Sequence, residues 1–76
     1  MRRMNRPEIR AEMRIVLKML RGMSDIEYRI ISTVMGRKAL DYVRRSWKNP
    51  ALAARLAKGG RSDAVAALRR ELARLR

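Results

Sequence analysis

The stretch SDIEYRIISTVMGRKALDYVRRSWKNP, residues 24–50, carries the start and stop signals of one long helix. Ser24 and Glu27 have the S-x-x-E spacing of a capping box, in which each side chain accepts a hydrogen bond from the backbone N–H of the other residue. Asn49 and Pro50 end the pattern, because the residue before a proline is disfavoured in helical geometry. These signals predict a helix over residues 25–48.

The hydrophobic pattern of this helix changes phase halfway along it. At about 100° per residue, its apolar side chains form two arcs that are rotated by roughly 120° from each other. The two arcs are Ile26, Ile30, Ile31 and Val34, then Leu40, Val43 and Trp47. A straight helix would bury only one of them. We therefore expect a kink near Gly36, with both halves packing inward.

A helix is also expected before this stretch. Asn5 and Glu8 repeat the capping-box spacing, and Pro7 lies in the first turn, where a missing N–H costs nothing. Gly22 is a typical C-terminal stop. These residues predict a helix over residues 6–21.

Two more helices are expected after it. Asn49 can cap a helix over residues 50–58, which a glycine pair ends, and Ser62 can cap a last helix over residues 62–75. No segment alternates in the way of a strand. With 76 residues, the chain is long enough for one small core. The sequence thus predicts an all-α bundle of about four helices in a single domain, residues 1–76.

The composition excludes several classes of protein. His and Cys are absent, which removes the usual acid–base, nucleophilic and soft-metal side chains, so we expect no enzyme, no cofactor and no metal site. No apolar run approaches the length of about 20 residues that a membrane span needs, and no signal peptide is evident. We expect a cytoplasmic, nucleoid-associated or virion protein, neither secreted nor transmembrane. The joint absence of Gln and Cys is a hint of a thermophilic source.

Positive charge dominates the chain. Lys and Arg number 20 against seven Asp and Glu, which gives a net charge of +13, and sixteen of the cations are Arg. A guanidinium group binds phosphate or carboxylate oxygens through paired N–H donors, so the bias towards Arg indicates contacts with anions. Self-repulsion at this charge would also be relieved by a polyanion.

One row of cations follows the first expected helix. On the helical wheel they fall within about 120°, while Glu8 and Glu12 lie elsewhere on the circumference. The row consists of Arg3, Arg6, Arg10, Arg14, Lys18 and Arg21. A charge row of this kind is either a solvated helix face or a surface for an anionic partner, and we expect it to follow a sugar–phosphate backbone.

Secondary contacts are expected from cations on the other helices. These are Arg37, Arg44, Arg45, Lys48, Arg61, Arg70 and Arg74. The three aromatic residues are not spaced as a platform for stacked bases, and Trp47 ends an apolar arc and is expected in the core. The sequence therefore predicts a structural protein that coats or compacts duplex DNA through its phosphates, of the chromatin type or the viral nucleoprotein or capsid type.

Self-association is a further expectation. Ile15 and Met19 project from a side of the first helix that neither the basic row nor the main apolar arc occupies. They belong either to a deeply embedded helix or to a contact with a second copy, and we favour a homodimer or higher homo-oligomer.

Residues 49–72 resemble a helix-turn-helix in outline, with a short Ala/Leu helix, a glycine turn and a second helix. The resemblance implies a dimeric transcription regulator that reads bases with residues 62–74. The turn is longer than usual, however, and Asp63, Ala66 and Ala67 are acidic or too short to read base edges. A helical hairpin within a bundle is the plainer interpretation.

Three further partners fit the charge. An RNA-associated or ribosome-associated protein would have a similar composition. A protein that lies on an anionic membrane surface would combine cations with an apolar face, although the first helix lacks an aromatic anchor. An acidic protein is the third.

Overall fold

The computed structural model describes residues 4–76 and is all-helical over that range. The helices are α1 (Arg6–Arg21), α2 (Asp25–Arg45), α3 (Pro50–Lys58) and α4 (Arg61–Arg74). The predicted small bundle of four helices is confirmed. Arg3 lies outside the described residues.

The predicted caps of the first three helices are confirmed. Asn5 and Glu8 form a reciprocal capping box at the start of α1, and Ser24 and Glu27 form another at the start of α2. At the start of α3, the Asn49 side chain accepts a hydrogen bond of 3.0 Å from the backbone N–H of Leu52. Local hydrogen bonding therefore sets where these helices begin.

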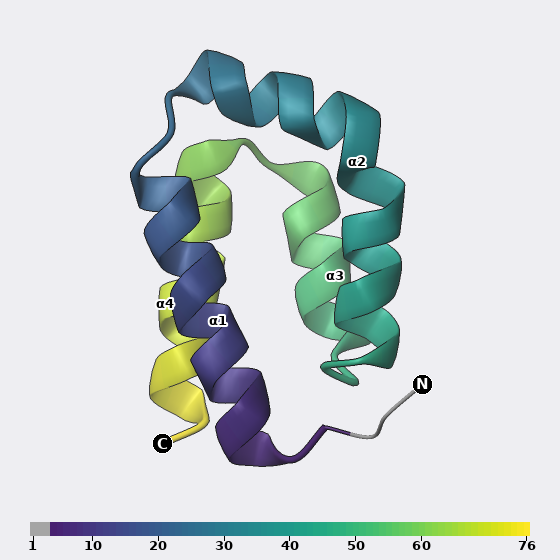
Figure 1. The fold of residues 1–76 in the computed structure, drawn as a ribbon, viewed down its shortest axis with the longest axis vertical. Helices are drawn as coiled ribbons and strands as arrows, with labels where there is room; N and C mark the ends of the chain where they lie inside the picture. The colour runs from purple at the N-terminus through teal and green to yellow at the C-terminus, as the bar shows by residue number, and fades with distance from the viewer. Residues whose placement is uncertain (1–3) are drawn as a thin grey trace.

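The long helix α2 is continuous but bent in the middle, as Figure 1 shows: it runs across one end of the molecule and then turns down beside α3. The Thr33 hydroxyl donates a hydrogen bond of 2.8 Å to the carbonyl of Arg29, a contact that often bends helices. Gly36 follows three residues later, and glycine is among the residues at which helices kink. The kink predicted near Gly36 is present without a break in the helix.

The C-terminal end of α2 differs from the prediction. The helix ends at Arg45, three residues before the predicted end at Lys48. Trp47 leaves the helix so that its ring can enter the core, where it is 5% exposed. Lys48 then adopts a positive φ of 51°, and Asn49 donates its backbone N–H to the carbonyl of Val43 over 3.2 Å. Burial of the tryptophan overrides the helical pattern.

The start of α4 also differs. The helix begins at Arg61, and the predicted cap Ser62 lies inside it. The N-cap is Gly60, and the carboxylate of Asp63 in the first turn accepts a hydrogen bond of 3.2 Å from the N–H of Gly60. Gly59 makes room for this arrangement, since a Cβ there would lie 2.4 Å from the Cβ of Asp63.

The helices form an open frame. α1 packs along α4, α3 packs between α4 and the second half of α2, and the first half of α2 bridges the two pairs (Figure 1). The aliphatic core lies where α1, α3, α4 and the end of α2 meet. Its largest fully buried side chains are Met13, Leu52 and Leu68.

The first half of α2 does not pack inward, and that prediction is wrong. Ile26 is 73% exposed, Ile30 is 58% exposed and Val34 is 77% exposed, and Ile31 is also exposed. The bend carries Val43 and Trp47 into the core but leaves the first arc outside it. The described residues thus hold only one of the two arcs in their core.

Glu12 connects α1 to the end of α2. Its Oε1 accepts hydrogen bonds from the Tyr42 hydroxyl at 2.5 Å and from Nε1 of Trp47 at 2.9 Å. The bond to Glu12 holds the Tyr42 proton in place and raises the pKa of that phenol above its ordinary value. One carboxylate therefore satisfies the N–H of the buried tryptophan.

Within residues 4–76, no helix is both long enough and apolar enough to cross a bilayer.

Replacing Glu12 with Leu is expected to lower the free energy of unfolding by about 1–3 kcal/mol, because the N–H of the buried Trp47 loses its acceptor. The matched control Asp41→Leu removes the same charge from an exposed intrahelical pair with Arg44 and should cost less than about 0.5 kcal/mol. Urea denaturation followed by tryptophan fluorescence measures both variants. Equal losses would show that Glu12 does not hold α1 in this way.

Candidate nucleic-acid interface

The cations of α1 form an exposed row. Arg6, Arg14, Lys18 and Arg21 are exposed, and no acidic side chain of residues 4–76 forms an ion pair with them. Arg10 is half-buried, and its Nε is buried without a hydrogen-bond partner among the described residues. The row is therefore largely available to an anion from outside.

The acidic residues of α1 are engaged elsewhere. Glu12 accepts hydrogen bonds from Tyr42 and Trp47, and the Glu8 carboxylate accepts one from the backbone N–H of Asn5 in the capping box. Both carboxylates can make these hydrogen bonds because they lie on a different part of the circumference of α1 from the cations. Glu12 therefore does not neutralise the exposed cations on this side of α1.

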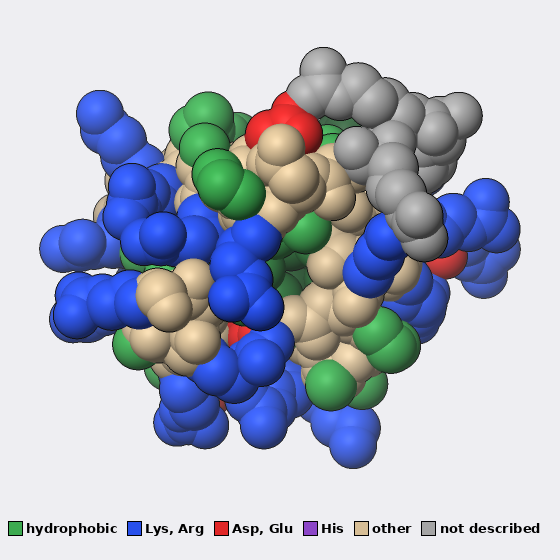
Figure 2. All heavy atoms as spheres, turned by 90° about the horizontal axis from the view of Figure 1, so that it is seen from below, with side chains coloured by type: hydrophobic (Ala, Val, Ile, Leu, Met, Phe, Trp, Pro, Cys, Tyr) green, Lys and Arg blue, Asp and Glu red, His purple; other side chains and the backbone are tan. Residues whose placement is uncertain are grey.

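Three cations from three different segments meet at one hollow. Arg6 at the start of α1, Lys48 between α2 and α3, and Arg74 at the end of α4 line a cavity of about 240 Å³, with Ile9, Met13, Trp47, Asn49 and Leu75. Figure 2 looks onto this end of the molecule, where Lys and Arg side chains surround most of the outline. The hollow has room for a phosphate group and carries the charge to attract one.

Lys48 lies in a conformation that disfavours a lysine. Its φ of 51° lies in the left-handed region, and no other non-glycine residue among residues 4–76 has a positive φ. Such a conformation costs a residue with a Cβ on the order of 1 kcal/mol relative to glycine. Because the turn would form more easily with glycine, the lysine side chain is a candidate for a role beyond folding.

Arg74 is held in place by Glu71. The Glu71 carboxylate accepts hydrogen bonds from Nε of Arg74 and, at 3.0 Å, from Nδ2 of Asn49. The Arg74 guanidinium, the strongest influence, and Asn49 together hold the pKa of this mostly buried carboxyl below its usual value. Through its bond to Asn49, Glu71 connects the end of α4 to the turn that carries Lys48.

The remaining predicted contacts fall into two groups. Arg37, Arg45 and Arg70 are exposed. Arg44 is exposed but paired with Asp41 at 3.0 Å.

Arg61 has a structural role in the fold. Its Nε lies 2.8 Å from Asp25, and its Nη1 donates to the carbonyl of Leu20 over 3.3 Å. The side chain thereby connects the start of α4 to the junction of α1 and α2, and it is half-buried there.

Ile15 and Met19, the predicted oligomer contacts, are each 60% exposed. They line a second, larger hollow of about 1030 Å³ inside the frame of the four helices. On α1 they lie on a different side from the basic row. The structure thus separates a charged surface from an apolar one.

No metal centre forms from the described residues, since no three acidic side chains gather where they could hold an ion.

Sequence reasoning missed the residues that organise this surface. The sequence pattern assigns no role to Glu12 or Glu71, yet each accepts hydrogen bonds from two partners. The spacing of Glu71 three residues before Arg74 was a usable signal, because such residues are neighbours on a helix. Nothing local signalled that Glu12 meets Trp47, which is 35 residues away.

Comparisons with protein-family models, with curated proteins and with solved structures each find no match to this chain.

Replacing Lys48 with glycine is expected to make the protein more stable than replacing it with alanine, by about 1 kcal/mol, because only glycine adopts the left-handed turn without steric cost. Both variants remove the same charge, so the comparison isolates the backbone. Thermal and urea denaturation measure the difference. An alanine variant as stable as the glycine variant would mean that position 48 is not strained.

Proposed function

We propose that this protein is a structural nucleic-acid-binding protein that coats or compacts duplex DNA through its phosphates, with little preference for sequence. The observation that carries the proposal is the row of exposed cations on α1, for which the described residues provide no acidic partner. Both a chromatin protein and a viral nucleoprotein or capsid protein meet this description.

The dimensions of the row suit a nucleic-acid backbone. α1 has 16 residues and is therefore about 24 Å long. Phosphates follow each other along one strand of B-DNA at about 3.4 Å of helix axis, so a helix of this length passes several of them. Counterions released from those phosphates would supply most of the affinity.

The hollow at the end of the molecule offers a second contact. A phosphate placed there would meet the charges of Arg6, Lys48 and Arg74 together. Arg6 belongs both to this hollow and to the row on α1. The two features therefore support one continuous path for the anion.

The start of α4 is poorly arranged for reading bases. Arg61 is held by Asp25, and Asp63 places a carboxylate at the point where a recognition helix would approach the bases. Ala64 and Ala67 are buried. These contacts favour binding through phosphates over the alternative of a helix-turn-helix regulator.

The first test neutralises the row on α1. In the test variant, Arg6, Arg14, Lys18 and Arg21 are all changed to Gln, and it should bind duplex DNA more weakly. The plot of log K against log salt should become less steep, its negative slope shrinking in magnitude by about 3–4, because each lost phosphate contact removes about 0.9. Fluorescence anisotropy with a labelled duplex at several salt concentrations measures this slope.

The control for this test removes four exposed cations from elsewhere: Arg29, Lys38, Arg55 and Lys58, all changed to Gln. Its slope should stay within about one unit of the wild type, since these residues lie outside the proposed path. If both variants lose the same amount of salt dependence, the effect comes from net charge alone, and α1 is not the binding surface.

The second test asks whether the protein reads sequence. Selection from a library of random duplexes should enrich no consensus, because the proposed contacts reach only phosphates. A regulator would instead discriminate its site by about a thousandfold or more. Competition between A-form RNA and B-form DNA of equal length then distinguishes a DNA-binding protein from an RNA-associated one.

A further inference from the structure

The exposed large apolar side chains gather in one region. Among residues 4–76 they lie on α1 and α2, mainly on the first half of α2. We define the apolar surface as Ile15, Met19, Ile26, Ile30, Ile31, Val34 and Met35. Scattered exposed apolar residues are normal on a protein, but a contiguous group of this size marks an interaction site.

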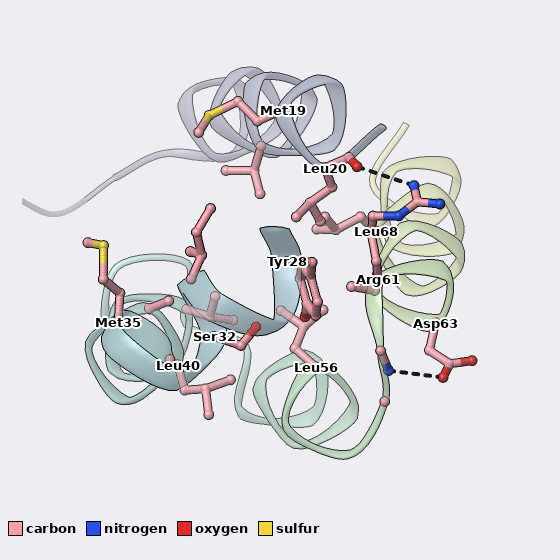
Figure 3. Close-up of a pocket in the computed structure, with 18 of the residues that line it drawn as sticks. Met19, Leu20, Tyr28, Ser32, Met35, Leu40, Leu56, Arg61, Asp63 and Leu68 are labelled. Carbon is pink, nitrogen blue, oxygen red and sulfur yellow. Dashed lines mark hydrogen bonds between the residues drawn. The ribbon is translucent and has the colours of Figure 1, made fainter. Parts of the chain in front are cut away.

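The apolar surface has two parts that join. Ile15, Met19, Ile31 and Met35 line the hollow of about 1030 Å³, and Figure 3 shows Met19 and Met35 on opposite sides of its open space. Ile26, Ile30 and Val34 do not line it and form a stripe at every fourth residue on the other side of α2. Ile31 and Met35 lie between the stripe and the hollow on the helix circumference, which makes the surface continuous.

A small apolar ligand would not cover this surface. A molecule inside the hollow would reach Met19 and Met35 but would leave Ile26, Ile30 and Val34 in water. The occupant must therefore extend over the outside of α2.

The apolar surface is large for a protein of this size. Its seven side chains are each between 45% and 77% exposed, and a standard protein interface covers about 800 Å² per partner.

The charge around this surface favours a second copy of the same chain. Residues 22–36 carry Arg29, Asp25 and Glu27, and Asp25 is paired with Arg61. Residues 30–36 carry no charge at all, and the next cations of α2 are Arg37 and Lys38. The chain as a whole carries +13. The first half of α2 is thus the place where two such chains can approach without bringing their cations together.

We propose that two copies of this chain associate through the first half of α2, about a two-fold axis near Ile30. In this arrangement the two helices run antiparallel, and Ile26 of each copy packs beside the partner's Val34, because a stripe at every fourth residue forms a ridge that can pair with itself. Ile31 and Met35 extend the contact towards the mouth of the hollow. The basic row on α1 stays outside the interface.

The pairing does not rest on the proposed function and is tested without nucleic acid. Sedimentation equilibrium of the full chain should give twice the mass of 8.9 kDa at about 0.1 mM protein, and the dimer should tighten as salt rises, because salt screens the repulsion between the copies. Nucleic-acid binding has the opposite dependence on salt, so failure of one claim is distinguishable from failure of the other.

The double variant Ile30→Glu, Val34→Glu should weaken the dimer at least about 100-fold, because it places unpaired carboxylates in an apolar contact. Both positions are exposed in the single chain, so its helical circular dichroism should be unchanged. The control Ala51→Glu, Ala54→Glu adds the same charge to exposed positions of α3 and should remain dimeric.

A crosslinking test addresses the geometry. The chain has no cysteine, so a single Ile30→Cys variant can form a disulfide only with another copy. Under mild oxidation it should crosslink at least about tenfold faster than the control Ala54→Cys, since only residues near a two-fold axis meet their own copies. A monomeric wild type, a dimeric glutamate variant or equal crosslinking of the two cysteine variants would overturn the proposal.

Discussion

The change of hydrophobic phase within α2 is the constraint on which the rest of the structure depends. Thr33 and Gly36 let the helix turn without breaking, and the turn brings Val43 into the core. The same turn carries Ile30 and its neighbours away from that core. None of the four described helices covers these side chains. The frame is therefore open, and the large hollow is a direct consequence of the bend.

The contacts of the acidic residues separate a charged surface from an apolar one. With seven carboxylates for 20 cations, most of the cations cannot have an acidic partner within the chain. Glu12 binds Tyr42 and Trp47 on the side of α1 away from the basic row. At the start of α2, Asp25 pairs with Arg61 and Glu27 accepts a hydrogen bond from the N–H of Ser24. The surfaces that we propose for nucleic acid and for a second copy thus lie on different sides of α1.

The sequence predicted the local features of the fold and missed those that depend on distant partners. Capping residues such as Asn5 and Ser24 act within three positions, so their spacing was sufficient evidence. Periodicity located the bend in α2, but it could not show that one arc would stay exposed, because exposure depends on how many helices are available to cover it. Trp47 and Glu12 meet across 35 residues, a contact that no local pattern encodes. For the same reason the convergence of Arg6, Lys48 and Arg74 became visible only in three dimensions.

The central claim is that the cations on α1 lie along a sugar–phosphate backbone, while α2 connects the copies that are bound to it. Electron microscopy of linear duplex DNA mixed with the purified protein tests this most directly, because it records how the protein is distributed along the strand. The account predicts a continuous coat of even width that forms on any sequence and dissociates at high salt. Bare DNA, or isolated particles at a few fixed positions, would contradict it.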